Sequence, residues 1–294
     1  MSWPGGSFKP PPSRARRWVE KSVGPGSEVI RVRRLKGGTA SAMHAIDVRA
    51  ASGSVVRLAL RRYLASRLID EMPDAAAREA RNLQVVEETD ISAPRLVAVD
   101  VAGDECEVPA VLMTHLAGHL ELRPRDLDLW LRRMAELLPA IHAVHPPAGV
   151  ISDWEMWDDL REAQPPDWSR NQSDWRQLIE IVRRPWPSYT PRFVHRDFQQ
   201  YNVLWSRGRP TGVVDWLNAS MRPVELDFSH FRHNLVFHFG YEAAERFAGI
   251  YEVVTGERPD PFWEALTLPV TWADSNARRE AFDAYASSLV MKLC

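Results

Sequence analysis

One polar cluster, set between short apolar segments in residues 193–216, constrains this chain more than any other feature. Its chemistry-bearing members are His195, Asp197, Asn202 and Asp215, at intervals of two, five and thirteen residues. Apolar runs lie on both sides of the first three and run directly into the fourth. This pattern predicts a loop held by short β-strands, with its polar side chains facing a cleft.

The residue types in this cluster point to phosphoryl transfer. Asp197 could accept a proton from a hydroxyl nucleophile, and Asn202 and Asp215 offer the hard oxygen ligands that magnesium prefers. One proton acceptor beside two metal-binding oxygens is the minimal equipment for moving a phosphoryl group from a nucleotide.

Composition limits the function classes and the number of domains. The 294 residues are enough for one large domain or two lobes. The net charge of -2 gives no reason to expect binding to nucleic acid or to a membrane. Cys106 and Cys294 have no nearby cysteine partner, so a cysteine metal site is excluded and a reducing compartment is favoured. No apolar run approaches the roughly 20 residues that span a bilayer, and residues 1–13 are rich in proline and glycine. We therefore expect a disordered tail over residues 1–13 and a cytoplasmic protein.

The first third of the chain predicts an antiparallel sheet with a glycine-rich turn. Residues 29–35, 44–48 and 54–60 have the composition of strands, and Gly37, Gly38 and Thr39 lie between the first two. Backbone amides in such a turn can approach phosphates without obstruction, although any hairpin can carry two glycines.

A strand residue and a helix residue are predicted to pair within this region. Ala59 and Arg61 share one face of the third strand, which would leave room for a flat base beside a cation. Residues 74–87 predict a helix in which Glu79 could meet that cation. The alternatives are an exposed arginine and a surface glutamate.

The middle of the chain predicts a hinge, a core helix and an unusual acidic segment. An apolar strand over residues 110–117 breaks at Gly118, and residues 127–141 follow helical periodicity. Residues 152–175 then combine seven acids with four tryptophans, which suits a cationic organic ligand through charge and cation–π contacts. The alternative is a solvated helical insertion whose tryptophans pack against the core.

The sequence resembles the aminoglycoside phosphotransferase-like family of small-molecule kinases. His195-x-Asp197, Asn202 and the Asp215-Trp216 pair carry the resemblance, and the Asp-Trp ending favours a small-molecule acceptor over a protein. The resemblance implies an α+β, bilobal protein-kinase-like fold, with a small antiparallel-sheet N-terminal lobe and a larger, mainly helical C-terminal lobe. It places a nucleotide-binding lobe over residues 14–114, and a helical lobe with the catalytic loop and acceptor site over residues 115–294.

The resemblance also implies roles for individual residues, with ATP and Mg²⁺ as cofactors. Asp197 would be the catalytic base, Asn202 and Asp215 the magnesium ligands, His195 a structural residue, and Asp227 a support for the catalytic loop. The residues implied in nucleotide binding are Gly37, Gly38, Thr39, Arg61, Glu79, Met113, Thr114 and Leu116.

Three departures from the family pattern stand out. Arg196 occupies a position where the family has glycine, and Gln199-Gln200-Tyr201 replaces its usual His-Pro-Gly. Arg61 stands where the family often has lysine, and its planar fork is not interchangeable with an ammonium. These departures bear on acceptor choice and nucleotide affinity.

The leading hypothesis is an ATP-dependent kinase that phosphorylates a hydroxyl of a small molecule, for which a cationic acceptor such as an aminoglycoside or amino alcohol is favoured. A macrolide, a sugar or an amino-acid-like compound is an alternative acceptor. The sequence does not decide between ATP and GTP as the donor, or between a monomer and a homodimer as the oligomeric state. The second hypothesis is a non-catalytic nucleotide-binding pseudokinase on the same fold.

Overall fold

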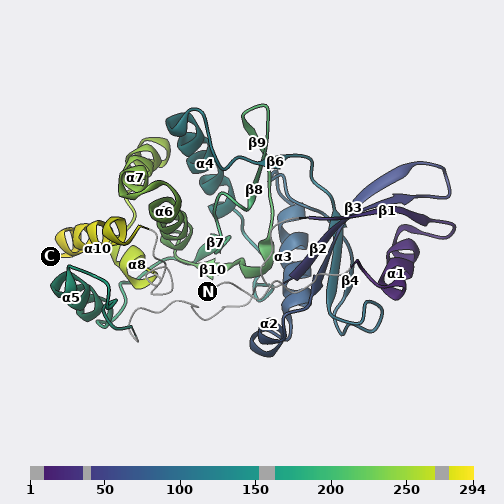
Figure 1. The fold of residues 1–294 in the computed structure, drawn as a ribbon, viewed down its shortest axis with the longest axis horizontal. Helices are drawn as coiled ribbons and strands as arrows, with labels where there is room; N and C mark the ends of the chain where they lie inside the picture. Colours follow the sequence, from purple (N-terminus) through teal and green to yellow (C-terminus); the bar gives the residue numbers. More distant parts are fainter. Residues whose placement is uncertain (1–9, 36–40, 152–162, 269–277) are drawn as a thin grey trace. The chain divides into compact units, whose positions relative to one another are not determined.

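The computed structural model describes residues 10–35, 41–151, 163–268 and 278–294. Their contacts divide into two compact units, each described by itself below. The first unit contains the chain up to Gly118 together with Thr211–Leu217, and the second contains His119–Pro210 and Asn218–Cys294. The fold is α+β, as expected, with an antiparallel sheet in the first unit and mainly helices in the second (Figure 1).

Five antiparallel strands build the first unit, in the order β1-β2-β3-β5-β4. Their bounds are β1 (Glu28–Arg34), β2 (Ser41–Arg49), β3 (Val55–Tyr63), β4 (Leu96–Asp100) and β5 (Ala110–Thr114). The predicted strands correspond to β1, β2 and β3. However, β2 begins at Ser41, because Ser41 pairs with Tyr63 across the ladder and extends the strand into the predicted turn.

Helices cover both faces of this sheet, which explains why the second half of β3 is buried throughout. Helix α1 (Ser13–Val23) places Trp18 in one apolar cluster with Leu58 and Leu60. Side chains alternate along a strand, so Ala59 and Arg61 lie on the other face, where Arg61 meets α3 (Ala75–Glu87). The short helix α2 (Ser66–Glu71) links the sheet to α3.

Helix α1 begins inside the segment predicted as a disordered tail. Pro11 is buried, and its carbonyl accepts a hydrogen bond from Arg16 Nε at 3.1 Å. The proline run fits a helix start, because proline is tolerated where the first N–H groups have no helical partner. Ser13, the last residue of the predicted tail, thus belongs to α1, and residues 1–9 lie outside the described part.

A late segment of the chain returns to the first unit. The Val213 N–H donates to the Ser92 carbonyl at 2.9 Å, and Ser92 Oγ donates to the Thr211 carbonyl at 2.7 Å. Thr211 Oγ1 in turn donates to the Ala117 carbonyl at 2.8 Å. Thr211–Leu217 therefore belongs to the first unit. The main part of this unit ends at Gly118, four residues after the boundary at residue 114 that the sequence indicated.

The second unit is mainly helical. Its helices are α4 (Leu127–His142), α5 (Gln172–Val182), α6 (Glu225–Phe239), α7 (Tyr241–Thr255), α8 (Pro261–Leu266) and α10 (Arg279–Leu293). Aromatic rings fill the space between α6 and α7: the Phe231 and Phe247 centroids lie 4.7 Å apart, and those of Phe228 and Tyr251 lie 4.9 Å apart. Such ring pairs add to the stabilisation that area burial alone provides.

One buried cation joins three helices of this unit. Arg232 of α6 forms ion pairs with Glu245 of α7 and Glu264 of α8, and the Tyr285 hydroxyl donates to Glu264 at 2.5 Å. Because a buried charge is costly when unpaired, these contacts fix how the helices pack.

Short strands frame the predicted catalytic segment of the second unit. Strand β7 (Arg192–Val194) pairs with β10 (Ser220–Arg222), and β6 (His119–Leu120) pairs with β8 (Val203–Ser206). Strand β9 (Arg209–Val213) adds to the sheet of β6 and β8 and leads into the first unit, ahead of a short 3-10 helix, Trp216–Asn218. Among the described helices, none has the length and apolar character needed to cross a membrane.

Candidate active site

The predicted catalytic loop connects β7 to β8 and is held by helix α6. The buried Asp227 carboxylate accepts hydrogen bonds from the backbone N–H groups of His195 at 2.9 Å and Arg196 at 2.6 Å. His142 Nε2, from the end of α4, lies 3.0 Å from the same carboxylate. The supporting role that the family resemblance implied for Asp227 is thus visible in its contacts.

These donors also set the charge of Asp227. Burial disfavours its carboxylate, but the hydrogen bond and charge of His142, with the donors at His195, outweigh burial and lower the pKa of Asp227. The loop is therefore fixed by an anion that stays charged under ordinary conditions.

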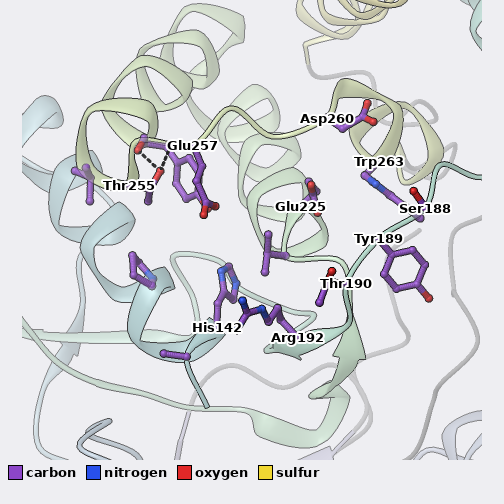
Figure 2. Close-up of a pocket in the computed structure, with 15 residues that line it drawn as sticks. His142, Ser188, Tyr189, Thr190, Arg192, Glu225, Thr255, Glu257, Asp260 and Trp263 are labelled. Carbon is purple, nitrogen blue, oxygen red and sulfur yellow. Dashed lines mark hydrogen bonds between the residues drawn. The ribbon is translucent and has the colours of Figure 1, made fainter. Parts of the chain in front are cut away.

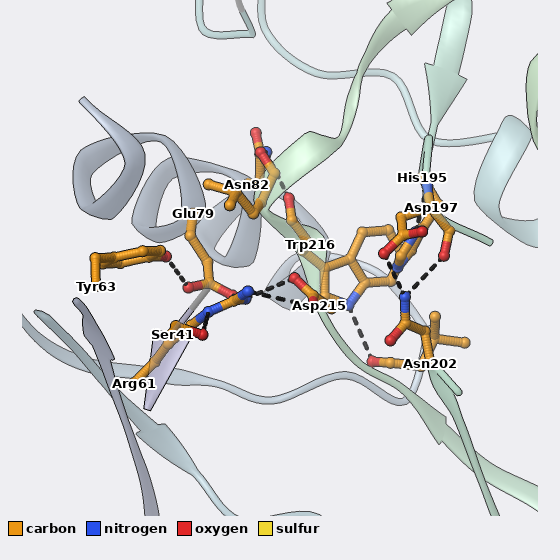
Figure 3. Close-up of polar contacts among 12 residues, drawn as sticks. Ser41, Arg61, Tyr63, Glu79, Asn82, His195, Asp197, Asn202, Asp215 and Trp216 are labelled. Atoms are coloured by element: carbon orange, nitrogen blue, oxygen red, sulfur yellow. Dashed lines mark hydrogen bonds and ion pairs between the residues drawn. The ribbon is translucent and has the colours of Figure 1, made fainter. Parts of the chain in front are cut away.

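Asp197, the predicted base, is partly exposed, accepts hydrogen bonds from its own loop and has a histidine of α6 within ion-pair distance. Gln199 Nε2 donates to its Oδ1 at 2.6 Å. Asn202 Nδ2 donates to its Oδ2 at 2.8 Å (Figure 3). His230 Nε2 lies 2.9 Å from Oδ1, at ion-pair distance but without hydrogen-bond geometry. Burial would raise the pKa of Asp197, but His230, His195 and Asn202 together lower it.

The sequence interpretation missed His230 and the contact of Gln199. A signal for His230 was present: it follows Asp227 by three residues in α6, so both side chains lie on one face of that helix. Since Asp227 faces the catalytic loop, the residue one turn later faces it too.

Asn202 is oriented by the same carboxylate. Its Nδ2 donates to both Oδ2 and the backbone carbonyl of Asp197, each at 2.8 Å. Because the amide is planar, this arrangement turns Oδ1, the atom able to bind a metal, away from Asp197.

Arg196 has a left-handed backbone, with φ of 69°. This conformation costs most residues about 1–2 kcal/mol and suits glycine, which explains the glycine usual in the family at this position. In this chain the hydrogen bond from Arg196 N–H to Asp227 helps to hold the conformation without glycine.

In the first unit, Arg61 is the centre of a buried polar cluster (Figure 3). Its Nη1 donates to Glu79 Oε1 at 2.8 Å, which is the predicted strand–helix contact. Its Nε donates to Ser41 Oγ at 3.0 Å, and the Tyr63 hydroxyl donates to the other oxygen of Glu79. The planar fork of arginine allows this divergent set, which a lysine ammonium could not reproduce.

Arg61 also binds Asp215 through both ends of its guanidinium. Nη1 lies 2.5 Å from Oδ1, and Nη2 lies 3.2 Å from Oδ2. Burial lowers the pKa of Arg61, but Asp215 and Glu79 more than offset it, so the pKa lies well above its ordinary value. Burial also raises the pKa of Glu79, against the opposing charge of Arg61.

Asp215 and Trp216 are held rigidly in the first unit. Asp215 has φ of 67°, and the buried Trp216 indole donates from Nε1 to the Val213 carbonyl at 3.0 Å. Asn82 Nδ2 of α3 donates to the Trp216 carbonyl at 2.7 Å. The hydrogen bonds of Trp216 with Val213 and Asn82 therefore fix the backbone that carries the Asp215 carboxylate.

The predicted base-binding residues lie at the end of β5. Met113 is buried and opposite Ala59 across the ladder, so the two side chains lie together on one face of the sheet. Thr114 is fixed by an exchange with Arg95: its Oγ1 accepts from Arg95 N–H at 2.8 Å, and its N–H donates to the Arg95 carbonyl at 2.9 Å. The Leu116 side chain lies close to Gly212. Gly37, Gly38 and Thr39 lie outside the described residues.

The described part of the acidic, tryptophan-rich segment is structural. Trp175 is buried and donates from Nε1 to Asp283 at 2.9 Å, and its ring packs edge-on against Trp168 at 6.3 Å. Asp174 accepts a hydrogen bond from Ser287. These contacts fix α5 against α10, as the core-packing alternative supposed, while residues 152–162 lie outside the described part.

A cavity of about 610 Å³ lies beside α4, α6 and α7 in the second unit (Figure 2). Three carboxylates, Glu225, Glu257 and Asp260, line it together with Arg192. Burial, with the charges of Asp260 and Glu257, raises the pKa of Glu225. His142 lines it, but none of the predicted site residues does.

These features define a phosphotransferase of the protein-kinase-like fold: a strand cation paired with a helix glutamate, and a supported loop with aspartate and asparagine. The chain belongs to the phosphotransferase enzyme family, whose profile matches residues 32–263. The predicted enzyme class, a small-molecule kinase, is confirmed at the level of this family.

Solved structures with similar folds include a candidate aminoglycoside phosphotransferase from Ralstonia eutropha, at 14% identity, a TM-score of 0.62 and 97% coverage of each chain. A thermostable mutant of aminoglycoside phosphotransferase APH(4)-Ia, bound to ADP and hygromycin B, has 16% identity and a TM-score of 0.58, with 95% of this chain and 97% of that chain covered. A type I macrolide 2'-phosphotransferase has 15% identity and a TM-score of 0.56, with 94% of each chain covered. A comparison with curated proteins finds no match.

Proposed function

We propose that this protein is an ATP- and magnesium-dependent O-phosphotransferase that moves the γ-phosphoryl group of ATP to a hydroxyl of a small molecule. The observation that carries the proposal is the state of Asp197. It is held as a carboxylate by three neighbouring side chains, on a loop fixed through Asp227. A partly exposed carboxylate with two hydrogen-bond donors and a histidine at ion-pair distance suits a group that must meet a substrate hydroxyl.

In the proposed reaction Asp197 orients the acceptor hydroxyl and takes its proton. The acceptor oxygen forms a bond to the γ-phosphorus while the bond from that phosphorus to the β–γ bridging oxygen breaks, and ADP leaves with the bond's electron pair. The lowered pKa of Asp197 makes it a weak base, so orientation is its larger contribution.

Magnesium fits the chemistry of the residues assigned to it. Asn202 offers an amide oxygen, and Asp215 offers a carboxylate whose lone pairs exceed its two contacts with Arg61. When bound, the ion would neutralise charge on the phosphates. Arg61, paired with Glu79 on α3, supplies a fixed cation for the same purpose.

Relatives of similar fold support the choice of substrates. Among them are an aminoglycoside phosphotransferase structure with ADP and hygromycin B, a streptomycin–ATP complex, and a complex with GDP and kanamycin. We therefore propose a nucleoside triphosphate as donor, ATP first, and a hydroxylated small molecule as acceptor.

Two substitutions test the assignment. Asp197→Asn should retain nucleotide binding, measured by calorimetry with ATP and magnesium, and should lower turnover by at least about 100-fold. Asp215→Asn should remove the magnesium dependence of nucleotide binding. The exposed Asp167→Asn is the matched control and should change neither. Turnover is measured as ADP release in a screen of aminoglycosides, macrolides, choline-like alcohols and sugars. A fully active Asp197→Asn enzyme would refute the role given to Asp197.

One observation favours the second candidate, a non-catalytic nucleotide-binding protein. Both oxygens of Asp215 contact Arg61, which competes with a metal for that carboxylate. This candidate predicts nucleotide binding that magnesium does not change, and no turnover with any member of the screen.

A further inference from the structure

The cavity beside α4, α6 and α7 has no part in the proposed reaction (Figure 2). Among the described residues that line it there is no Asp197, Asn202 or Asp215, and all of them belong to the second unit. Its volume of about 610 Å³ falls within the range of small-molecule sites, roughly 300–1,000 Å³. The walls that this one unit supplies indicate which class of molecule the cavity suits.

His142 presents one ring nitrogen to this cavity. Its Nε2 lies 3.0 Å from the Asp227 carboxylate, which only accepts, so Nε2 carries the proton and donates it. In the neutral ring Nδ1 is then a hydrogen-bond acceptor. Nδ1 makes no hydrogen bond with a described residue, and unlike the enclosed unpaired atoms of this unit it is open to solvent. The side chain is 10% exposed and lines the cavity, so a ligand completes its hydrogen bonds only by donating to Nδ1 (Figure 2).

The charges around the cavity favour a cation. Glu225 lies in the first turn of α6, Asp260 immediately precedes α8, and Glu257 lies between α7 and α8. None of the three carboxylates forms an ion pair with a described residue. Arg192 is the only arginine or lysine among the described lining residues, so negative charge is in excess. Burial and the like charges of Asp260 and Glu257 raise the pKa of Glu225, and a bound cation would offset both effects.

Aromatic and apolar side chains supply the remaining walls. The rings of Tyr189 and Trp263 pack edge-on with centroids 5.2 Å apart, and Tyr251 of α7 lines the cavity with them. Val224 and Val254 add aliphatic surface. Aromatic faces attract organic cations, and the apolar surface suits the methylene groups that join two polar ends of a ligand.

The hydrogen-bond and charge requirements together select an ammonium group. An ammonium has three donors and no acceptor, so it matches the open Nδ1 of His142 and the nearby carboxylates at once. A carboxylate ligand has no proton to donate and would meet three like charges. A neutral alcohol can donate to Nδ1 but leaves the excess negative charge in place.

We propose that this cavity binds a small aliphatic amine in its ammonium form, which donates a hydrogen bond to His142 Nδ1 and is held by the charges of Glu225, Glu257 and Asp260. The site is distinct from the catalytic loop, since Asp197 does not line it. The proposal does not rest on the proposed function, because an amine without a hydroxyl is no acceptor in that reaction.

The test is calorimetry on the full chain without nucleotide, with putrescine (1,4-diaminobutane) as the probe. In comparison, 1,4-butanediol keeps the chain and the donors but has no charge, and tetramethylammonium keeps a charge but has no donor. Glu225→Gln removes one charge at nearly constant shape, and Glu257→Gln serves if that variant is unstable. Glu242→Gln is the matched control, because Glu242 is exposed and also lies in the first turn of a helix, α7.

We expect putrescine to bind the wild type and Glu242→Gln equally, and to bind Glu225→Gln at least about 10-fold more weakly. Both comparison compounds should bind the wild type at least about 10-fold more weakly than putrescine does. Asp197→Asn should bind putrescine as the wild type does, because Asp197 is not part of this cavity.

Four results would overturn the proposal. The first two are no binding of putrescine, and equal binding by the wild type and Glu225→Gln. Equal binding of either comparison compound would show that the charge or the donated hydrogen bond is not used. Loss of putrescine binding in Asp197→Asn would place the amine at the catalytic loop instead. None of these results depends on turnover, so an enzyme without kinase activity would overturn the proposed function and leave the amine site standing.

Discussion

Replacing Asp227 with asparagine tests the support of the catalytic loop with a change of only one atom. In the wild type, Oδ2 accepts from His195 N–H at 2.9 Å and lies 3.0 Å from His142 Nε2, while Oδ1 accepts from Arg196 N–H at 2.6 Å. Asparagine can keep its oxygen at the Oδ2 position, but its NH₂ group then faces the Arg196 N–H. Asp227→Asn therefore loses one charge-assisted hydrogen bond and leaves a buried donor unpaired.

The magnitude follows from these two losses. A hydrogen bond to a charged group is worth about 1.5–3 kcal/mol, and an unsatisfied buried group costs about 1–3 kcal/mol. The lost hydrogen bond and the unpaired donor belong to the same contact, so their costs are not fully additive. We expect the free energy of unfolding to fall by about 3 kcal/mol. Urea titration followed by tryptophan fluorescence measures this, with the exposed Asp167→Asn as a control that should stay within about 0.5 kcal/mol of the wild type.

The pKa of Asp227 adds a second requirement. Because its folded-state pKa lies below the ordinary value of 3.8, its stabilisation is complete above that value and disappears as pH falls through the folded-state pKa. The difference between wild type and Asp227→Asn should therefore be constant at neutral pH and shrink below about pH 4. A loss under 1 kcal/mol at pH 7, or a difference that does not change with acid, would refute this account of the loop.

Three further substitutions probe the sites described above. Arg61→Lys should lower the free energy of unfolding, measured by urea titration, by about 2 kcal/mol. The reason is that one ammonium group cannot contact Ser41, Glu79 and Asp215 with the geometry of a guanidinium. Unchanged stability would show that the planar guanidinium is not required. Gly212→Ala should lower the free energy of unfolding by about 1–3 kcal/mol, because its Cβ would lie 2.5 Å from Leu116 Cδ1 and 2.9 Å from the Ser92 carbonyl oxygen. If calorimetry gives this variant the wild-type Tm, the close contact is not present. Arg196→Gly should keep the wild-type Tm or exceed it, because glycine accepts φ of 69°. Arg196→Val should lower the free energy of unfolding by more than about 1 kcal/mol. Equal thermal unfolding of the two variants would exclude backbone strain at this position.

Much of the fold could be predicted because its signals are local. Alternation of apolar and basic residues marked residues 29–35, which form β1, and helical periodicity placed Glu79 on the buried face of α3. The cluster from His195 to Asn202 is contiguous in sequence, so its members had to lie in one loop.

The missed features depend on distant contacts. Asp215 lies 154 residues from Arg61, and no periodicity relates the two, so their pairing was not expected. His230 reaches Asp197 only because α6 packs beneath the loop. The tryptophans Trp168 and Trp175 carried a ligand signal in sequence, but their rings pack edge-on against each other within the helical unit, and the Trp175 indole donates a hydrogen bond to Asp283.

The contact of Asp227 with two backbone amides has a consequence for the folding of the catalytic loop. The amide protons of His195 and Arg196 end on a carboxylate that has 0% exposure and belongs to a helix about thirty residues later in the chain. Solvent reaches these protons only when α6 separates from the loop, so their hydrogen exchange should follow the cooperative opening of the helical unit rather than local fraying. A segment without regular secondary structure would then rank among the slowest-exchanging parts of the molecule.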